Sequence, residues 1–227
     1  MPYSPDLLCC SRRLVIAAAL LALPLGAQAQ MAVPATPVTV RVLLTTSAGP
    51  ITLEVEKDRA PITAGNFLRY VDQKRLDGTA FYRAVKVQDG FGLVQGGPNN
   101  AIKRVLPPIA HEPTSRTGLT HKDGTISMAR NAPGTAQGEF FITVGDQPSM
   151  DADPTKPGDN LGFAAFGHVV DGMEVVRHIL DAPTSPTSGP PGMKGQMLEP
   201  AVRIVSARRV AATPAATAPA TAVPQAQ

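Results

Sequence analysis

The chain has 227 residues, of which 43% are hydrophobic, and a formal net charge of +3. This length is enough for one sizeable hydrophobic core, so one domain with short tails is the expected organisation. Only 17% of the residues are charged, which excludes the dense basic surface typical of nucleic-acid-binding proteins. The 23 prolines and 20 glycines favour many strands joined by turns over a helical bundle.

The first 29 residues have the pattern of an export signal. Arg12 and Arg13 precede an apolar run over 14–25, and Ala27–Ala29 is a small-residue cleavage site. The run is shorter than the roughly 20 residues that cross a bilayer. We therefore predict a signal peptide over 1–29, a periplasmic location and no stable membrane insertion after cleavage. General secretion and the twin-arginine route both fit this pattern.

Both cysteines, Cys9 and Cys10, fall within the predicted signal. The mature chain would have none, which excludes disulfides, thiol nucleophiles and thiolate metal sites. The four histidines are scattered without the spacing of metal ligands. We therefore predict no metal site and no cofactor.

The remaining chain alternates short apolar strands with turn-rich connections. Residues 30–37 form a Pro/Ala linker, and the tail at 211–227 contains only Ala, Pro, Thr, Val and Gln, a composition that predicts disorder. Between them, at 38–210, we predict eight strands and two helices. The strands are expected at Val38–Thr46, Ile51–Glu56, Thr79–Lys86, Phe91–Gly96, Thr125–Ala129, Glu139–Val144, Leu161–Val169 and Val202–Arg209, and the helices at Ala60–Gln73 and Gly172–Leu180.

Two further features concern the ends of these elements. Asp58 is a candidate cap for the first helix, and Pro61 stands in its first turn, where a missing N–H costs nothing. The connection over 97–124 is long and contains prolines, so we expect it to be functional or to wrap around the surface.

Residues 81–97, FYRAVKVQDGFGLVQGG, place polar side chains among apolar ones on two adjacent strands. The strands are joined by a turn at Asp89-Gly90. Strict alternation predicts one shared face on each strand: Phe81, Arg83 and Val85 on the first, and Phe91, Leu93 and Gln95 on the second.

FYR and VQGG, followed by SMAR and EFFI in that order, resemble the cyclophilin family of peptidyl-prolyl cis-trans isomerases, from about Val38 to Val210. The resemblance implies a mainly β fold, a closed eight-stranded antiparallel β-barrel capped by two α-helices. Because the interior of an eight-stranded barrel is just filled by side chains, a substrate groove must lie on its outer wall.

The resemblance also implies roles for nine residues. Arg83 matches the family's catalytic arginine, and Gln95 matches the glutamine that hydrogen-bonds the substrate backbone, although the two are separated by more residues than is usual in the family. The implied substrate-binding residues are Phe91, Leu93, Ala129, Arg130, Phe141, Met150 and Phe163.

The chain departs from the family pattern at several positions. Gly92 stands where the family has a Phe, so Phe91 is expected to substitute for it. Arg130 replaces an asparagine whose backbone binds substrate, Glu139 replaces a glutamine, and Ser149 replaces the tryptophan of many eukaryotic members.

We therefore predict a monomeric isomerase that rotates X–Pro bonds in exported, Pro-containing polypeptides. One alternative is a chaperone or scaffold that holds such peptides in the same groove without catalysis, which intact Arg83 and Gln95 disfavour. A small-ligand barrel is the other alternative, and the densely apolar strands disfavour it.

Overall fold

The computed structural model describes residues 37–99 and 101–211. The predicted signal peptide, nearly all of the linker and all but the first residue of the predicted tail lie outside the described residues. Within the described part, no helix is long and apolar enough to cross a membrane. The same residues contain no group of three or more His, Cys, Asp or Glu side chains that could hold a metal ion.

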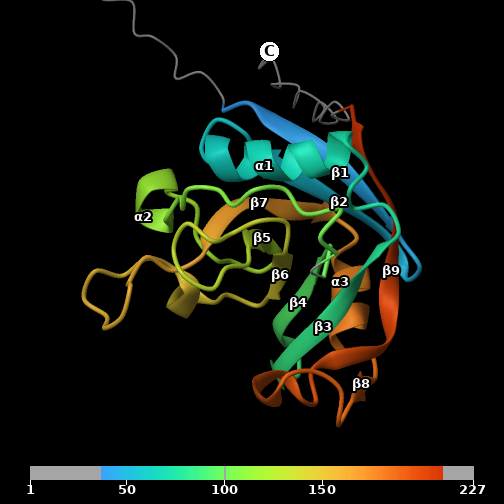
Figure 1. Ribbon diagram of the computed structural model, residues 1–227. Coiled ribbons are helices and arrows are strands. Elements are labelled where there is room, and N and C mark those ends of the chain that lie inside the picture. Colours follow the sequence, from blue (N-terminus) through green and yellow to red (C-terminus); the bar gives the residue numbers. More distant parts are fainter. Residues whose placement is uncertain (1–36, 100, 212–227) are drawn as a thin grey trace, which may run out of the picture. The chain divides into compact units, whose positions relative to one another are not determined.

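Eight antiparallel strands close into a barrel, as the sequence predicts (Figure 1). Their bounds are β1 (Thr39–Thr46), β2 (Gly49–Glu56), β3 (Thr79–Gln88), β4 (Phe91–Gly97), β5 (Thr125–Met128), β6 (Phe140–Val144), β7 (Ala164–Asp171) and β9 (Met197–Val210). The order around the barrel is β1-β2-β7-β5-β6-β4-β3-β9, and β9 pairs back with β1. A two-residue strand that was not predicted, β8 (Thr184–Ser185), pairs with β9 outside this ring.

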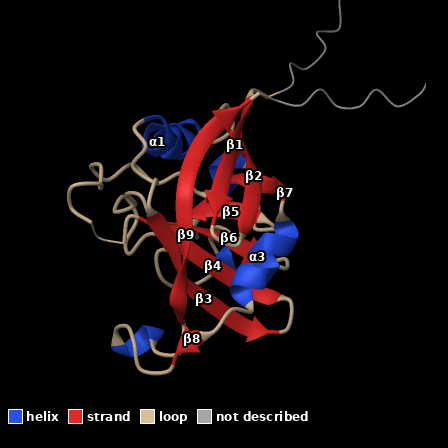
Figure 2. Cartoon of the chain, turned by 90° about the vertical axis from the view of Figure 1, so that its right-hand side faces the viewer, coloured by secondary structure: helices blue, strands red, loops and turns tan. Residues whose placement is uncertain are grey.

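Two helices match the prediction, α1 (Pro61–Asp72) and α3 (Met173–Leu180). A single turn, α2 (Thr114–Thr117), was not predicted and interrupts the long connection between β4 and β5. Helix α1 packs on β2, β7 and β9, whereas α3 packs on β2, β3, β4 and β6. Figure 2 shows the two helices well apart on the barrel.

The barrel interior is filled by aromatic side chains. Phe67 of α1 meets Phe140 edge-on at 5.5 Å between ring centroids and lies 5.2 Å from Phe166. Phe81 meets Phe140 edge-on at 5.6 Å. All four rings are at most 1% exposed. A substrate must therefore bind outside the barrel.

The start of α1 differs from the prediction. Ala60 is the N-cap residue, and the carboxylate of Asp58 instead accepts a hydrogen bond from the Val38 amide at 2.8 Å. The first-turn amide of Thr63 donates to Glu112 Oε2 at 2.6 Å, and Glu112 is buried. The β4–β5 connection thus folds back onto α1 and brings the Glu112 carboxylate to its N-terminus. A negative charge at this end of a helix is stabilising.

An irregularity in β3 overturns strict alternation. Phe81 and Ala84 face the core, whereas Tyr82 and Arg83 are both partly exposed. The pairing register with β4 and with β9 shifts between Phe81 and Arg83. A bulge of this kind turns two consecutive side chains to the same side. The prediction that Phe81 shares a face with Arg83 is therefore wrong, and Tyr82 takes that place.

Candidate active site

A cavity of about 400 Å³ lies on the outer wall of the barrel, beside β3, β4 and β6. Its volume is within the range of small-molecule and peptide side-chain pockets. Eight of the nine site residues expected from the sequence line it: Arg83, Leu93, Gln95, Ala129, Arg130, Phe141, Met150 and Phe163. The fold thus brings together residues of β3, β4 and β6 and of the two connections β5–β6 and β6–β7.

Phe91 is the one expected residue that does not line the cavity. It begins β4, and a Cβ at Gly145 would lie 2.6 Å from the Phe91 ring, so the ring covers Gly145. A strand rises about 3.4 Å per residue, so Phe91 lies about 7 Å beyond Leu93 along the strand. It shares the outer face with Leu93 but sits too far from the cavity to replace the family's phenylalanine.

The Gly92 position itself excludes any side chain. A Cβ there would lie 2.1 Å from the carbonyl oxygen of Val85 on the neighbouring strand. The carbonyl oxygen of Gly92 also accepts a hydrogen bond from the buried amide of Gln147. This close backbone approach explains why glycine occupies the position.

Strand register places four side chains in a row across the outer wall. Phe141 of β6 pairs with Gln95 of β4, and Gln95 pairs with Arg83 of β3. Arg83 in turn pairs with Met197 at the start of β9. The long sequence separation between Arg83 and Gln95 is taken up by the β3–β4 hairpin, so the two residues still face each other directly.

The Arg83 guanidinium is held from two sides. Gln196 Oε1 accepts hydrogen bonds from its Nε at 2.9 Å and its Nη2 at 2.6 Å, and Gln95 Oε1 accepts from its Nη1 at 3.0 Å. Arginine has five N–H donors, so these described side chains leave two for a ligand in the cavity. Burial lowers the pKa of Arg83, yet an arginine remains cationic at neutral pH.

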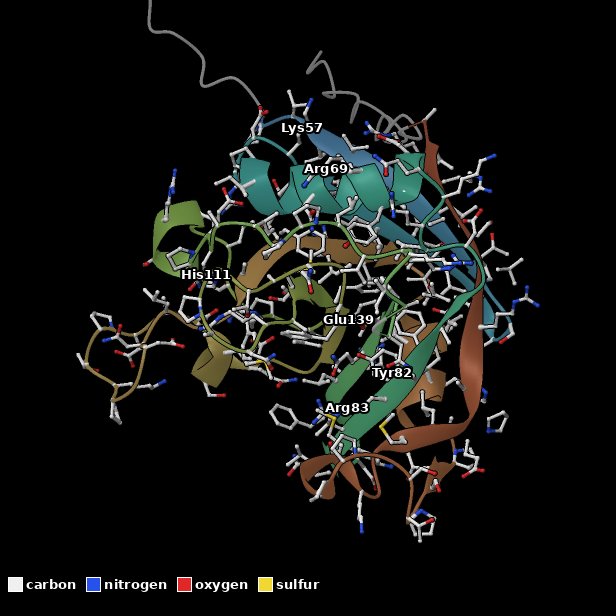
Figure 3. All side chains as sticks on the ribbon, in the orientation of Figure 1. Lys57, Arg69, Tyr82, Arg83, His111 and Glu139 are labelled. Carbon is white, nitrogen blue, oxygen red and sulfur yellow. The ribbon has the colours of Figure 1, made fainter. Side chains whose placement is uncertain are left out.

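A hydrogen-bond chain continues from Gln95 to the far wall of the cavity. Gln95 Nε2 donates to the Tyr82 hydroxyl at 2.8 Å, and that hydroxyl donates to Glu139 Oε2 at 2.8 Å. Figure 3 shows Tyr82 and Arg83 together on β3, with Glu139 nearby just before β6. Burial, and secondly the Glu139 charge, raise the pKa of Tyr82, so its hydroxyl keeps its proton. Because the Tyr82 hydroxyl donates to Glu139, it can only accept from Gln95, and this fixes the orientation of the Gln95 amide.

The apolar end of the cavity is built from two rings and a cation. Phe163 meets Phe141 edge-on at 5.3 Å, and the Arg130 guanidinium lies 5.4 Å over the Phe163 ring. Arg130 also donates to the Gly162 carbonyl at 2.6 Å and pairs with Asp159 at 2.8 Å, which lowers the pKa of Asp159 to about 2. The sequence assigned Arg130 a backbone role, whereas its side chain holds the segment that carries Phe163.

Comparison with known proteins agrees with this architecture. Residues 41–209 match the family described as cyclophilin type peptidyl-prolyl cis-trans isomerase/CLD. This chain belongs to the cyclophilin family. It is therefore a peptidyl-prolyl cis-trans isomerase.

Bacterial relatives share more than a third of its residues over the aligned region. Peptidyl-prolyl cis-trans isomerase A of Dickeya dadantii is 38% identical over 146 residues, covering 63% of this chain and 72% of that protein. A peptidyl-prolyl cis-trans isomerase of Acinetobacter baylyi is 36% identical over 165 residues, covering 71% and 80%. A Cryptosporidium parvum cyclophilin structure, 21% identical, superposes with a TM-score of 0.59 over 78% of this chain and 100% of that one, which shows the same fold.

A buried histidine supports the floor of this cyclophilin's cavity. The His121 ring stacks on Phe141 at 6.1 Å with an interplanar angle of 12°. Its Nδ1 lies 2.6 Å from Asp151 Oδ1, and its Nε2 lies 3.0 Å from Ser127 Oγ. Burial lowers the pKa of His121 although Asp151 opposes this shift. His121 thus ties the turn that carries Met150 to β5, where Ser127 is the register partner of Phe141.

Sequence reasoning missed several residues of the site, among them Tyr82, Met193, Gln196 and Met197. Tyr82 was visible within FYR, but its outward direction depends on the β3 bulge. Met193 and Gln196 come from the connection between α3 and β9, which has no apolar periodicity, and Met197 is the first residue of β9. The expected start of β9 at Val202 was also too late, because Pro200 interrupts the apolar pattern. Only strand pairing between β3 and β9 reveals these neighbours of Arg83.

Proposed function

We propose that this cyclophilin isomerises X–Pro bonds in exported polypeptides, with Arg83 as the catalytic hydrogen-bond donor and the apolar end of the cavity as the proline site. The observation that carries the assignment is the placement of Arg83. Its guanidinium is fixed by Gln95 and Gln196 on the cavity wall, in the same row as Phe141.

The reaction needs no acid, base, nucleophile or metal. Rotation about an X–Pro bond passes through a twisted state in which amide resonance is lost, with a barrier of about 18–20 kcal/mol. A catalyst must bind that twisted state more strongly than either planar form. Interactions with the prolyl nitrogen serve this purpose because its lone pair localises only as resonance is lost.

A fixed guanidinium can make such an interaction. Arg83 would donate to the prolyl nitrogen, or to the neighbouring carbonyl oxygen, from the N–H groups that Gln95 and Gln196 leave available. One preorganised donor typically contributes about 2.7–4 kcal/mol to a transition state. Because Gln95 and Gln196 already hold the side chain, little reorganisation is needed at the moment of rotation.

The proline ring would lie at the apolar end. Phe141 and Phe163 form a right-angled corner, and Leu93 and Met150 line the same cavity. A ring held in this corner keeps its place while the preceding carbonyl rotates. An apolar surround also excludes water, which strengthens the hydrogen bond from Arg83.

The binding site can be mapped by NMR. A short peptide with one Ala–Pro bond, titrated into the protein, should shift the signals of Phe141, Phe163 and Leu93, but not that of Phe91. Exchange spectroscopy on the same sample should show accelerated cis-trans exchange. A shifted Phe91 with unmoved Phe141 would refute the site, and binding without exchange would favour the non-catalytic chaperone.

We further propose that the protein acts in the periplasm as a monomer. The basic pair before the apolar run at 14–25, and the lack of cysteine after it, support export. The exposed large apolar side chains among the described residues lie on several different elements, which supports a monomer. Amino-terminal sequencing should find a chain that begins near Gln30 in the periplasmic fraction. An intact Met1 in the cytosol would refute export, and light scattering would test the monomer.

A further inference from the structure

The end of the connection between α3 and β9, together with the first residue of β9, contributes an apolar wall to the cavity. Pro190, Met193 and Met197 all line it, although none belongs to the expected proline site. Pro190 is exposed, and the two methionines are partly buried. We call these three residues the methionine wall.

Backbone hydrogen bonds fix the methionine wall in place. The Ala84 amide of β3 donates to the Gln196 carbonyl at 2.8 Å, and the Gly195 amide donates to the Ser185 carbonyl at 3.1 Å. The Met193 amide closes a 3-10 turn on the Pro190 carbonyl at 2.8 Å. These bonds tie the connection to β3 and β8, so the wall is an ordered part of the fold.

A glycine makes room for the Met197 side chain. Gly189 has φ +96°, a conformation that side chains rarely adopt. A Cβ at Gly189 would lie 2.7 Å from Met197 Cγ, so any larger residue would push the methionine away. The close packing of this pair holds Met197 against the cavity.

The row of paired residues gives the distance from the proline site. Phe141, Gln95, Arg83 and Met197 lie on four consecutive strands. Strands are about 4.8 Å apart, so Met197 lies about 5 Å beyond Arg83 and about 14 Å from Phe141. An extended peptide advances about 3.3–3.6 Å per residue. The prolyl amide would lie at Arg83, and the roughly 5 Å from there to Met197 corresponds to one or two residues of the peptide.

We propose that the methionine wall is an accessory subsite that binds an apolar side chain of the substrate, one or two residues from the isomerised proline. The inference rests on the proposed substrate site, with which the wall is continuous around one cavity. Methionine side chains are flexible and polarisable, so they fit apolar groups of different shapes. The subsite would therefore select for apolar character without demanding one particular residue.

Peptides that differ at single flanking positions test the subsite. The set has a constant Ala–Pro pair and carries either Leu or Ser at each of the two positions on either side of it. NMR exchange needs no coupled protease, so the flanking residues can vary freely. We expect Leu to exceed Ser by about five- to tenfold in kcat/KM at one of these positions, as partial burial of a leucine side chain predicts.

Variants assign this preference to the wall. Met193→Gln combined with Met197→Gln keeps side-chain length but removes apolar character, and should reduce the Leu-to-Ser ratio below about twofold. Val205→Thr is the control, because Val205 is an exposed apolar residue on β9 that does not line the cavity. It should keep the wild-type ratio.

The outcomes separate the subsite from the catalytic assignment. Equal rates for Leu and Ser at every position, or an unchanged ratio in the double variant, would overturn the subsite while leaving the isomerase site intact. If the wild type turned over none of the peptides, the proposed catalytic role would fail. The subsite would then be tested by the ratio of the Leu and Ser peptides' dissociation constants, measured from the same spectra. If the double variant does not fold, the single variants Met193→Gln and Met197→Gln take its place.

Discussion

Gln196 Oε1 accepts two hydrogen bonds from Arg83, from Nε at 2.9 Å and from Nη2 at 2.6 Å, although the residues are 113 positions apart. The backbone of Gln196 is itself paired with Ala84, next to the arginine in β3. Gln95 holds the opposite side of the guanidinium. The direction of the catalytic donor is therefore set by the last connection of the barrel as well as by the β3–β4 hairpin.

Replacing Gln196 should lower turnover without unfolding the protein. Gln196→Ala removes the acceptor of both bonds, and hydrogen bonds to charged groups contribute about 1.5–3 kcal/mol. We expect kcat to fall roughly tenfold with little change in melting temperature. Gln196→Glu retains an oxygen acceptor at the same reach and should keep the larger part of the activity. Full activity in Gln196→Ala would show that Gln95 alone positions Arg83.

The hydroxyl of Tyr82 should affect stability at alkaline pH. Burial raises the pKa of Tyr82 in the folded state, whereas an unfolded tyrosine titrates near 10. Above about pH 10 the unfolded chain releases a proton that the folded chain retains, so the free energy of unfolding falls as pH rises. Tyr82→Phe removes this contribution and should flatten the decline in urea titrations between pH 9 and 11. A smaller decline in the free energy of unfolding should remain in that variant, because burial also raises the pKa of Tyr70. Identical slopes in the wild type and Tyr82→Phe would contradict the assignment.

Two neighbours on β4 provide a matched pair for the proline site. Leu93 and Phe91 both project from the outer face of β4, but only Leu93 lines the cavity. Leu93→Ala should reduce kcat/KM for an Ala–Pro peptide by about tenfold, the scale expected for loss of part of an apolar contact. Phe91→Ala should leave kcat/KM within about twofold of the wild type, on the same scale of apolar contacts. The opposite ranking would restore Phe91 to the site.

Acid should destabilise the fold through His121. Burial lowers the pKa of His121, so below about 6.5 the unfolded chain binds a proton that the folded chain does not. The free energy of unfolding should then fall as pH decreases from 7 to 5.5. His121→Gln should reduce that slope, and His111, whose pKa burial also lowers, accounts for part of the remainder. His178→Gln, at an exposed position on α3, serves as the control. A slope unaffected by His121→Gln would mean that the pKa of His121 is the same in the folded and unfolded chains, which would contradict this account.

The strands and helices could be predicted from the sequence because their evidence is local, whereas the closed barrel followed from the resemblance to the family. Eight short runs of alternating apolar residues, separated by turn residues, are enough to define the strands, and the two helices follow from their own apolar spacing. Arg83 and Gln95 were found because they lie in motifs on adjacent strands of one hairpin.

The rest depends on irregularities and on long-range pairing. The bulge in β3 turns Tyr82 outward, and no alternation rule anticipates it. Gln196 and Met197 meet Arg83 only through pairing of β3 with β9, across a Pro-rich segment that has no strand pattern. The prediction that Asp58 caps α1 was wrong, because Glu112 from the β4–β5 connection supplies the carboxylate instead.

The central claim is that Arg83 carries the catalysis. In NMR exchange on an Ala–Pro peptide, Arg83→Ala should lose roughly a hundred- to a thousandfold in rate, as removal of a donor worth about 2.7–4 kcal/mol predicts. Arg83→Lys keeps the charge but loses the planar fork, so it should also be strongly impaired. Circular dichroism and peptide affinity should change little, because the side chain lies in the cavity and not in the barrel core. A folded Arg83→Ala protein with near wild-type exchange rates would contradict the account.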